Sequence, residues 1–194
     1  MRLVALMIVS AAVMVSPLSA SADPGDHVRP LDRLVALVVE RLDTGDAVAA
    51  AKWVSAARTG TEPTIDDPAR EAVVYDSMAR LGADRDLPEN WVRQVFAGQI
   101  ESNKIVQRGL ITRWRFDQAA APGSAPDLTV VRPVIDRVNV EIVDQLAARR
   151  AELTAPDCAE RLAGSVFGVF GAGNTDALHQ AALVRAAAAL CAPR

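Results

Sequence analysis

The spacing of apolar side chains constrains the fold of this chain more than any other feature. Apolar residues recur every three or four positions through nearly all of the 194 residues, and segments of alternating Val, Ile and Thr are scarce. The first spacing gathers apolar side chains on one face of an α-helix, whereas alternation is typical of a strand. We therefore expect an all-α fold, a single-domain bundle of about six helices.

Turn and cap residues divide this helical pattern into segments. Asp67 and Pro68 are typical of an N-cap followed by proline at the first helical position. Gly82 indicates a helix end, and Gly45 either kinks the first helix or ends it. The expected helices cover about 30–53, 68–81, 87–116, 127–153, a short stretch from 157, and 175–191. We interpret the glycine-bearing segment 164–173 as a loose connection or a frayed helix.

The N-terminal residues have the composition of a secretory leader. Arg2 precedes a short apolar segment, and an Ala-Ser-Ala cleavage site follows. We expect residues 1–22 to be a cleaved signal peptide and residues 23–194 to be an exported domain, periplasmic or secreted. The apolar segment is short for a membrane span, and an uncleaved N-terminal anchor is the alternative.

Charge and residue types limit the classes of function. The formal net charge is −3, and it becomes −4 once Arg2 is removed, so overall charge does not favour nucleic-acid binding. Any anion site must then be a local pocket. The two histidines, His27 and His179, lie far apart, and no metal-binding motif occurs, so we expect no metal and no cofactor.

Two cysteines, Cys158 and Cys191, lie near the C-terminus of the expected exported domain. An even number of cysteines in an oxidising compartment predicts a disulfide. The bridge would close a loop of about 33 residues and stabilise the fold by about 3–4 kcal/mol in the chain-entropy model. Two free thiols are the alternative.

Two cations interrupt the apolar face of the first helix. Arg41 and Lys52 are eleven residues apart, about three helical turns, and they share a face with Leu34, Val38 and Val48. Cations on a core-facing stripe are costly unless an anion neutralises them. Either a carboxylate of this chain does so, or a ligand does.

Further polar groups lie at comparable positions on other helices. Arg70 and Arg132 are near the starts of two expected helices, where the helix dipole favours an anion. Gln99, Asn103 and Gln107 lie beside the apolar stripe of the third helix. Taken singly, each arginine fits a surface salt bridge, and the amides could bond to each other or to water. Taken together, six of these side chains would suit a small molecule with two negative charges and neutral oxygens between them: Arg41, Lys52, Arg70, Arg132, Asn103 and Gln107.

The order of these residues resembles that of one known family. The resemblance is carried by Glu40-Arg41-Leu42, 46–53, 65–67 with Arg70, Val95-Phe96 with Gln99-Ile100, 125–128 with Arg132, Ile135-Asp136, Asn139, and the pair Cys158 and Cys191. The family is the secreted, all-helical chorismate mutases of the AroQ class, gamma subclass, which have the type II fold. The resemblance covers nearly the whole mature chain.

This resemblance implies the Claisen rearrangement of chorismate, a dicarboxylate with an ether, to prephenate. It also implies a homodimer. The implied roles are carboxylate binding by Arg41 and Arg132 with help from Arg70, carboxylate and ether-oxygen contacts by Lys52, donation to the same ether oxygen by Gln107, and a carboxylate bond from the amide of Asn103. Such a site needs no cofactor.

The sequence departs from the family pattern at Val74, where the family usually has a Gln or Glu that contacts the substrate hydroxyl. Gln107 also replaces a glutamate that some secreted relatives carry. Two alternatives therefore remain: an exported helical protein that binds a small dicarboxylate without turnover, and an interaction protein whose cations are neutralised internally.

Overall fold

The structure is a computed structural model that describes residues 29–193. This part of the chain is all-helical, as predicted, and contains no strand. The elements are α1 (Asp32–Thr59), α2 (Pro68–Ala83), α3 (Glu89–Phe116), the 3-10 helix η1 (Gln118–Ala120), α4 (Leu128–Ala148), α5 (Arg150–Thr154), α6 (Cys158–Gly171) and α7 (Ala177–Ala187). The predicted leader over 1–22 and His27 lie outside the described residues.

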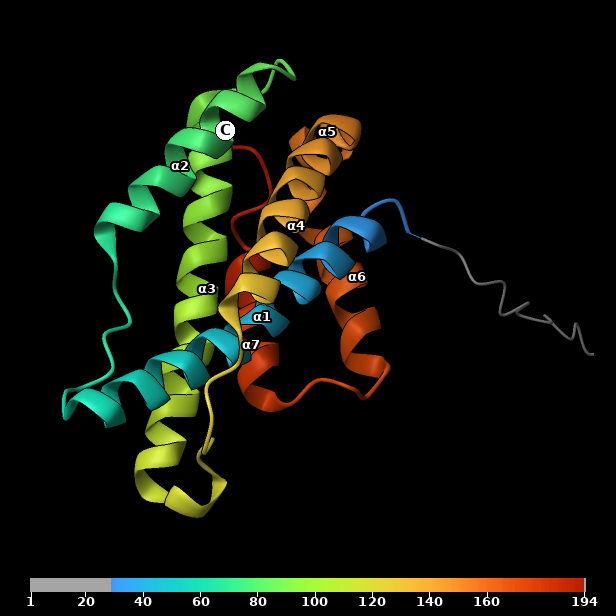
Figure 1. The fold of residues 1–194 in the computed structure, drawn as a ribbon. Helices are drawn as coiled ribbons and strands as arrows, with labels where there is room; N and C mark the ends of the chain where they lie inside the picture. The colour runs from blue at the N-terminus through green and yellow to red at the C-terminus, as the bar shows by residue number, and fades with distance from the viewer. Residues whose placement is uncertain (1–28, 194) are drawn as a thin grey trace, which may run out of the picture.

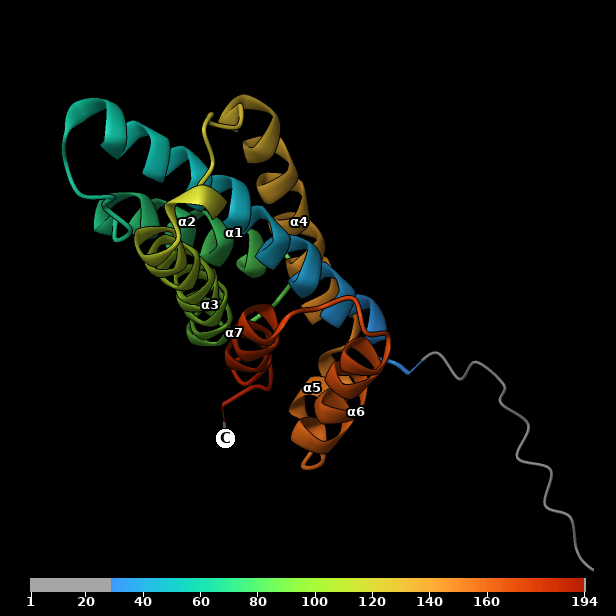
Figure 2. The ribbon, with the colours of Figure 1, turned by 90° about the horizontal axis from the view of Figure 1, so that it is seen from below.

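The longest helices form the centre of the molecule. α1 packs against α3 and α4, and α3 also packs against α2 and α7. α2 and α6 lie on opposite sides of the bundle in both views (Figures 1 and 2). The main core contains fully buried apolar side chains from α1, α3, α4 and α7, including Leu34, Leu37, Val38, Trp91, Val95, Phe96, Val138, Ile142, Leu146 and Leu183.

The first helix corrects one prediction. α1 runs without interruption through Gly45 to Thr59, so this glycine does not end it. A Cβ atom at Gly45 would lie 3.1 Å from Nδ2 of Asn103 and 3.2 Å from Cγ1 of Val106. Gly45 therefore allows α1 and α3 to approach closely where they cross.

The helix end predicted near Gly82 is confirmed to within two residues, whereas the loose connection considered over 164–173 is not found. Gly82 lies inside α2, and a Cβ atom there would be 2.6 Å from Cγ2 of Val92 on α3. Most of the segment 164–173 belongs to α6, which continues to Gly171. Glycine disfavours a helix only modestly, so a glycine within a helical pattern does not by itself mark a boundary.

Aspartates cap the entry to two helices, and the cap predicted at Asp67 is confirmed. Asp67 accepts a hydrogen bond from the backbone N–H of Arg70 at 3.1 Å, at the start of α2. Asp127 accepts one from the N–H of Thr129 at 2.8 Å, at the start of α4. The helix expected over 127–153 is divided in two at Arg149, which adds α5 to the expected number.

The predicted disulfide between Cys158 and Cys191 is confirmed, with Cα atoms 6.0 Å apart. The C-terminal segment is also held by α3, because Nε1 of Trp91 donates to the carbonyl of Leu190 at 2.9 Å. Within residues 29–193, no helix is both long and apolar enough to cross a membrane.

Candidate functional site

A cavity of about 270 Å³ lies among α1, α2, α3 and α4. All six residues that the sequence suggested as a binding set line it, although they come from four helices. The polar lining consists of Arg41, Thr44, Lys52, Asp67, Arg70, Glu71, Asn103, Lys104, Gln107, Arg132, Asp136 and Asn139; the apolar lining consists of Val48, Ile65, Val74, Ile100, Leu128, Val131 and Ile135.

Arg41 is a buried cation in the wall of this cavity, with 6% of its surface exposed. Its Nε donates to Oδ1 of Asn139 at 2.8 Å, and its Nη1 donates to the carbonyl of Gln99 at 2.9 Å. It forms no ion pair within residues 29–193. Burial lowers the pKa of Arg41 to about 10, against the opposite effect of Tyr75, so the guanidinium stays charged at neutral pH. The positive charge therefore has no internal counter-ion.

Lys52 lies three turns further along α1 and reaches the same cavity. Its Nζ donates to the backbone carbonyl of Ile65, in the loop between α1 and α2, at 2.7 Å. Within the described part of the chain it forms no ion pair either. Partial burial lowers the pKa of Lys52, while the charges of Asp67 and Asp66 act in the opposite direction. A carbonyl satisfies one of its three N–H donors and leaves its charge uncompensated.

Arg70 and Arg132 are exposed side chains at the edge of the cavity. Each lies in the first turns of a helix, α2 and α4 respectively, so the positive end of the helix dipole adds to the guanidinium charge. The surface salt bridges considered from the sequence do not occur for these two residues within 29–193. Both guanidinium groups are therefore available to an anion.

The amides of α3 divide into two groups. Nε2 of Gln107 donates to Oδ1 of Asn103 at 2.7 Å, and Nδ2 of Asn103 donates to the carbonyl of Arg41 at 3.4 Å. The expectation that amides bond to each other is thus confirmed for this pair, but both line the cavity. Oε1 of Gln107 is buried without a protein partner. Gln99 is buried outside the lining and contributes its backbone carbonyl to Arg41.

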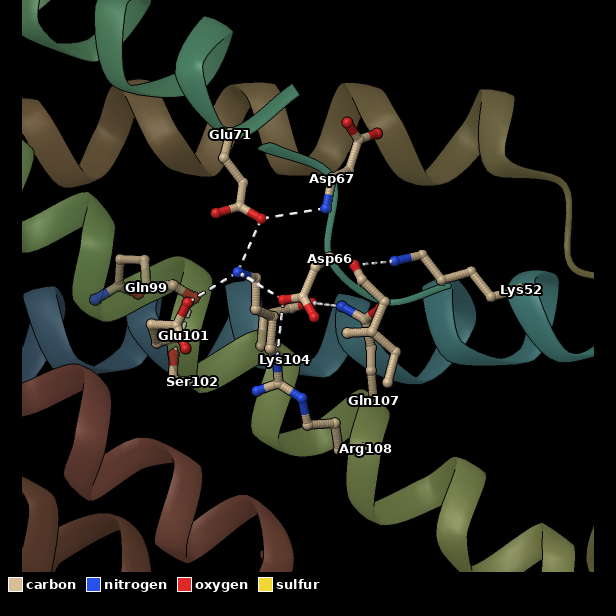
Figure 3. A network of polar contacts seen from close by, with 12 residues as sticks. Lys52, Asp66, Asp67, Glu71, Gln99, Glu101, Ser102, Lys104, Gln107 and Arg108 are labelled. Carbon is tan, nitrogen blue, oxygen red and sulfur yellow. Dashed lines mark hydrogen bonds and ion pairs between the residues drawn. The ribbon is translucent and has the colours of Figure 1, made fainter. Parts of the chain in front are cut away.

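The sequence reasoning missed two charged residues of the cavity. Glu71 follows Arg70 on α2, and Lys104 follows Asn103 on α3. Figure 3 shows Lys104 between carboxylates of α2, α3 and the α1–α2 loop. Asn139 was noted only as part of a resemblance, and its bond to Arg41 was not expected. The sequence could have indicated Lys104, because it is a cation on the buried face of α3, as Arg41 is on α1.

The arrangement favours binding and electrostatic stabilisation of an anion. Five cations, three amides and three carboxylates line one cavity, and no histidine or cysteine of residues 29–193 lines it. The described residues also contain no group of three or more His, Cys, Asp or Glu side chains suited to a metal ion. Fixed donors in a partly closed site are suited to a reaction whose transition state redistributes negative charge.

Comparison with known proteins identifies a family whose members are named as chorismate mutases. A family model described as chorismate mutase type II matches residues 32–108, a segment that contains five of the six candidate residues. The chain is 33% identical over 184 residues to the secreted chorismate mutase of Mycolicibacterium smegmatis, covering 93% of this chain and 98% of that protein. It is 29% identical over 181 residues to the secreted chorismate mutase of Mycobacterium tuberculosis, covering 92% and 86%.

Two solved structures are similar to this chain in both fold and sequence. The chorismate mutase of Burkholderia thailandensis superposes with a TM-score of 0.74 at 32% identity, covering 84% of this chain and 99% of that chain. The chorismate mutase of Burkholderia phymatum gives a TM-score of 0.75 at 32% identity, covering 84% and 97%. The chain therefore belongs to the family of secreted, all-helical type II chorismate mutases.

Proposed function

We propose that the cavity among α1–α4 converts chorismate to prephenate by a unimolecular Claisen rearrangement. The observation that carries this proposal is the pairing of Arg41 and Lys52. Both are cations of α1 that lack an ion-pair partner within residues 29–193, and both line one cavity with Gln107. A partly buried charge without a counter-ion reduces stability, and an anionic substrate offsets that cost when it binds.

The cations bind and orient the substrate. Arg41 and Arg132 take its two carboxylates, Arg70 assists at the edge of the cavity, and the amide of Asn103 adds a neutral donor. Arg41 is held by two acceptors, so its guanidinium is pre-organised before the substrate arrives. Holding a flexible substrate in the folded, reactive conformer lowers the barrier without any proton transfer.

Lys52 and Gln107 stabilise the transition state. As the C–O bond of the ether breaks, negative charge develops on the ether oxygen. The ammonium of Lys52 retains two donors beyond its bond to Ile65, and the amide nitrogen of Gln107 retains one beyond its bond to Asn103. Hydrogen bonds that strengthen as the charge develops lower the activation barrier more than they tighten ground-state binding.

Recognition of the substrate hydroxyl is assigned to Glu71. Val74 lines the cavity but has no polar side-chain atom, which favours the alternative of a dicarboxylate-binding protein without turnover. Glu71 lies about one turn earlier on α2 and lines the same cavity. Its Oε1 accepts from Lys104 at 2.8 Å and from the N–H of Asp67 at 3.3 Å, which leaves Oε2 for a hydroxyl.

Purified protein mixed with chorismate tests the proposal through the loss of ultraviolet absorbance. We expect saturable turnover by the wild type, and none above background for Arg41→Ala or Lys52→Ala with helicity unchanged by circular dichroism. Arg93→Ala is the matched control, because Arg93 is a cation of α3 that pairs with Glu89 and Asp76 away from the cavity. Saturable binding without turnover would select the alternative function, and unfolding of either α1 variant would make its cation structural.

Two expectations from the sequence belong to this proposal as well. We infer cleavage after residue 22, which an intact-mass measurement of the exported protein would test. We also infer a homodimer from the family resemblance, which light scattering of the mature protein would test.

A further inference from the structure

Lys104 binds three carboxylates at once, although only 8% of its surface is exposed. Its Nζ lies 2.8 Å from Glu71 on α2, 2.9 Å from Glu101 on α3 and 3.0 Å from Asp66 in the α1–α2 loop. Figure 3 shows these contacts converging on the ammonium group. Arg108, one turn later on α3, also binds Asp66 at 2.9 Å. Residues from three parts of the chain thus form one acidic cluster, Asp66, Glu71 and Glu101, around these two cations.

This cluster lies next to the lysine that we assign to catalysis. Lys52 donates to the carbonyl of Ile65, the residue directly before Asp66. Glu71 and Lys104 both line the cavity. Carboxylates without neighbouring cations at this point would disfavour substrate binding in two ways. They would repel a doubly anionic substrate, and the carboxylate of Asp66 would compete with that substrate for Lys52.

We propose that Lys104 is a positioning residue that holds Asp66, Glu71 and Glu101 together, so that Lys52 stays without a counter-ion and the cavity stays open to a dianion. This inference rests on the proposed function, because it assigns Lys104 a part in substrate affinity at the same site. Lys104 itself does not touch the reacting atoms in this account. Its charge acts through the acidic cluster.

Charge counting makes the inference specific. The cluster holds three carboxylates and two cations, Lys104 and Arg108, for a net charge of −1. Lys104→Gln makes it −2. Adding Asp66→Asn returns the net charge to −1 and removes the carboxylate nearest Ile65. A double variant should therefore regain substrate affinity, even though it contains fewer ion pairs than either single variant.

Steady-state kinetics with chorismate tests the inference. We expect K104Q to raise KM on the order of 10-fold, with kcat changed by less than about 2-fold, because both the ground state and the transition state are repelled. The increase should shrink at high salt, since the cluster is partly exposed. Lys104→Arg keeps the charge and should stay near the wild type. Arg93→Gln, which also removes a cation of α3 bound to two carboxylates, should leave KM unchanged.

The double variant D66N/K104Q provides the decisive measurement. We expect its KM to lie within about 3-fold of the wild type, a recovery that a purely structural role for Lys104 would not produce. If K104Q alone is too unstable to assay, the same recovery is required of the double variant. A lower kcat at constant KM in K104Q, or no recovery in D66N/K104Q, would overturn the inference.

A failure of the proposed function can be distinguished from a failure of the inference about Lys104. If the wild type does not turn over chorismate, calorimetric titration with prephenate, itself a dicarboxylate, reports on Lys104 directly. The same pattern of dissociation constants across the variants would then support Lys104 as the residue that keeps the anion site open. Equal dissociation constants for the wild type and K104Q would overturn it.

Discussion

Arg41 on α1 donates from Nε to Oδ1 of Asn139 on α4, at 2.8 Å, and both side chains are buried. The acceptor is a neutral amide at a position where a carboxylate of nearly the same shape would fit. A neutral acceptor satisfies the guanidinium N–H without cancelling its charge. The absence of an ion-pair partner for Arg41 within residues 29–193 therefore depends on the neutral amide of Asn139.

Asn139→Asp should therefore lower the activity of the protein without lowering its stability. The new carboxylate would give Arg41 an internal counter-ion and compete with a substrate carboxylate, so we expect kcat/KM to fall by about 10²-fold or more. The melting temperature should stay the same or rise, because a buried charge gains a partner. Asn139→Ala is the control, which removes the acceptor without adding charge and should cost less activity. Wild-type kcat/KM in N139D would show that the charge of Arg41 is not needed.

Gln107→Glu should change the pH dependence of the reaction. A glutamine amide donates a hydrogen bond at every pH. Gln107 should therefore cause little change in the kcat of the wild type between pH 5 and pH 8. The introduced carboxyl group donates only when protonated. At pH 8 we expect kcat on the order of 10²-fold below the wild type, recovering toward pH 5. A variant as active at pH 8 as at pH 5 would exclude donation by this side chain to the ether oxygen.

His179 should make stability depend on pH. Its Nδ1 lies 2.9 Å from Asp176 and its Nε2 lies 3.0 Å from Asp46 on α1. Partial burial alone would lower the pKa of His179, but the hydrogen bonds and charges of Asp176 and Asp46 outweigh it and raise the pKa. Asp43, the nearby α1 carboxylate, also interacts with His179 electrostatically.

The sign of the effect follows from the raised pKa. The stabilisation is fully present below the ordinary histidine value near 6.5, and it is lost as pH rises through the higher pKa of the folded state. Denaturant unfolding should therefore give a smaller free energy of unfolding at pH 8.5 than at pH 6. In His179→Gln this difference should shrink, with kcat unchanged, since none of these groups lines the catalytic cavity. An identical difference in the two proteins would contradict this role.

Removal of the disulfide should lower stability without affecting catalysis. Cys158 and Cys191 are 33 residues apart in the sequence, and neither lines the cavity. We expect the double alanine variant to lose about 3 kcal/mol of unfolding free energy. Its kcat/KM at 25 °C should match that of the wild type, because Trp91 still holds the C-terminal segment at the carbonyl of Leu190. A large loss of kcat/KM with native helicity would show that the bridge shapes the cavity.

Much of this protein could be predicted from short-range patterns in the sequence. Apolar periodicity predicted the helices, Asp67 predicted the start of one of them, and the six polar side chains singled out from the sequence all line the cavity. These predictions succeed because helical spacing and capping depend on neighbours within a few residues. The possible helix end at Gly45 was wrong because this glycine lies where α3 packs against α1, and local propensity contains no information about that neighbour.

The sequence by itself determined which faces of the helices carry charge among apolar residues. The tertiary structure alone decided how each charge is compensated. Arg41 meets the neutral Asn139, Lys52 meets a backbone carbonyl, and Lys104 meets three carboxylates. All three are cations on largely buried helical faces, and spacing cannot distinguish them. The difference arises because each partner comes from a part of the chain that folding brings near, and only the distances between side chains set whether a charge is neutralised or left for a ligand.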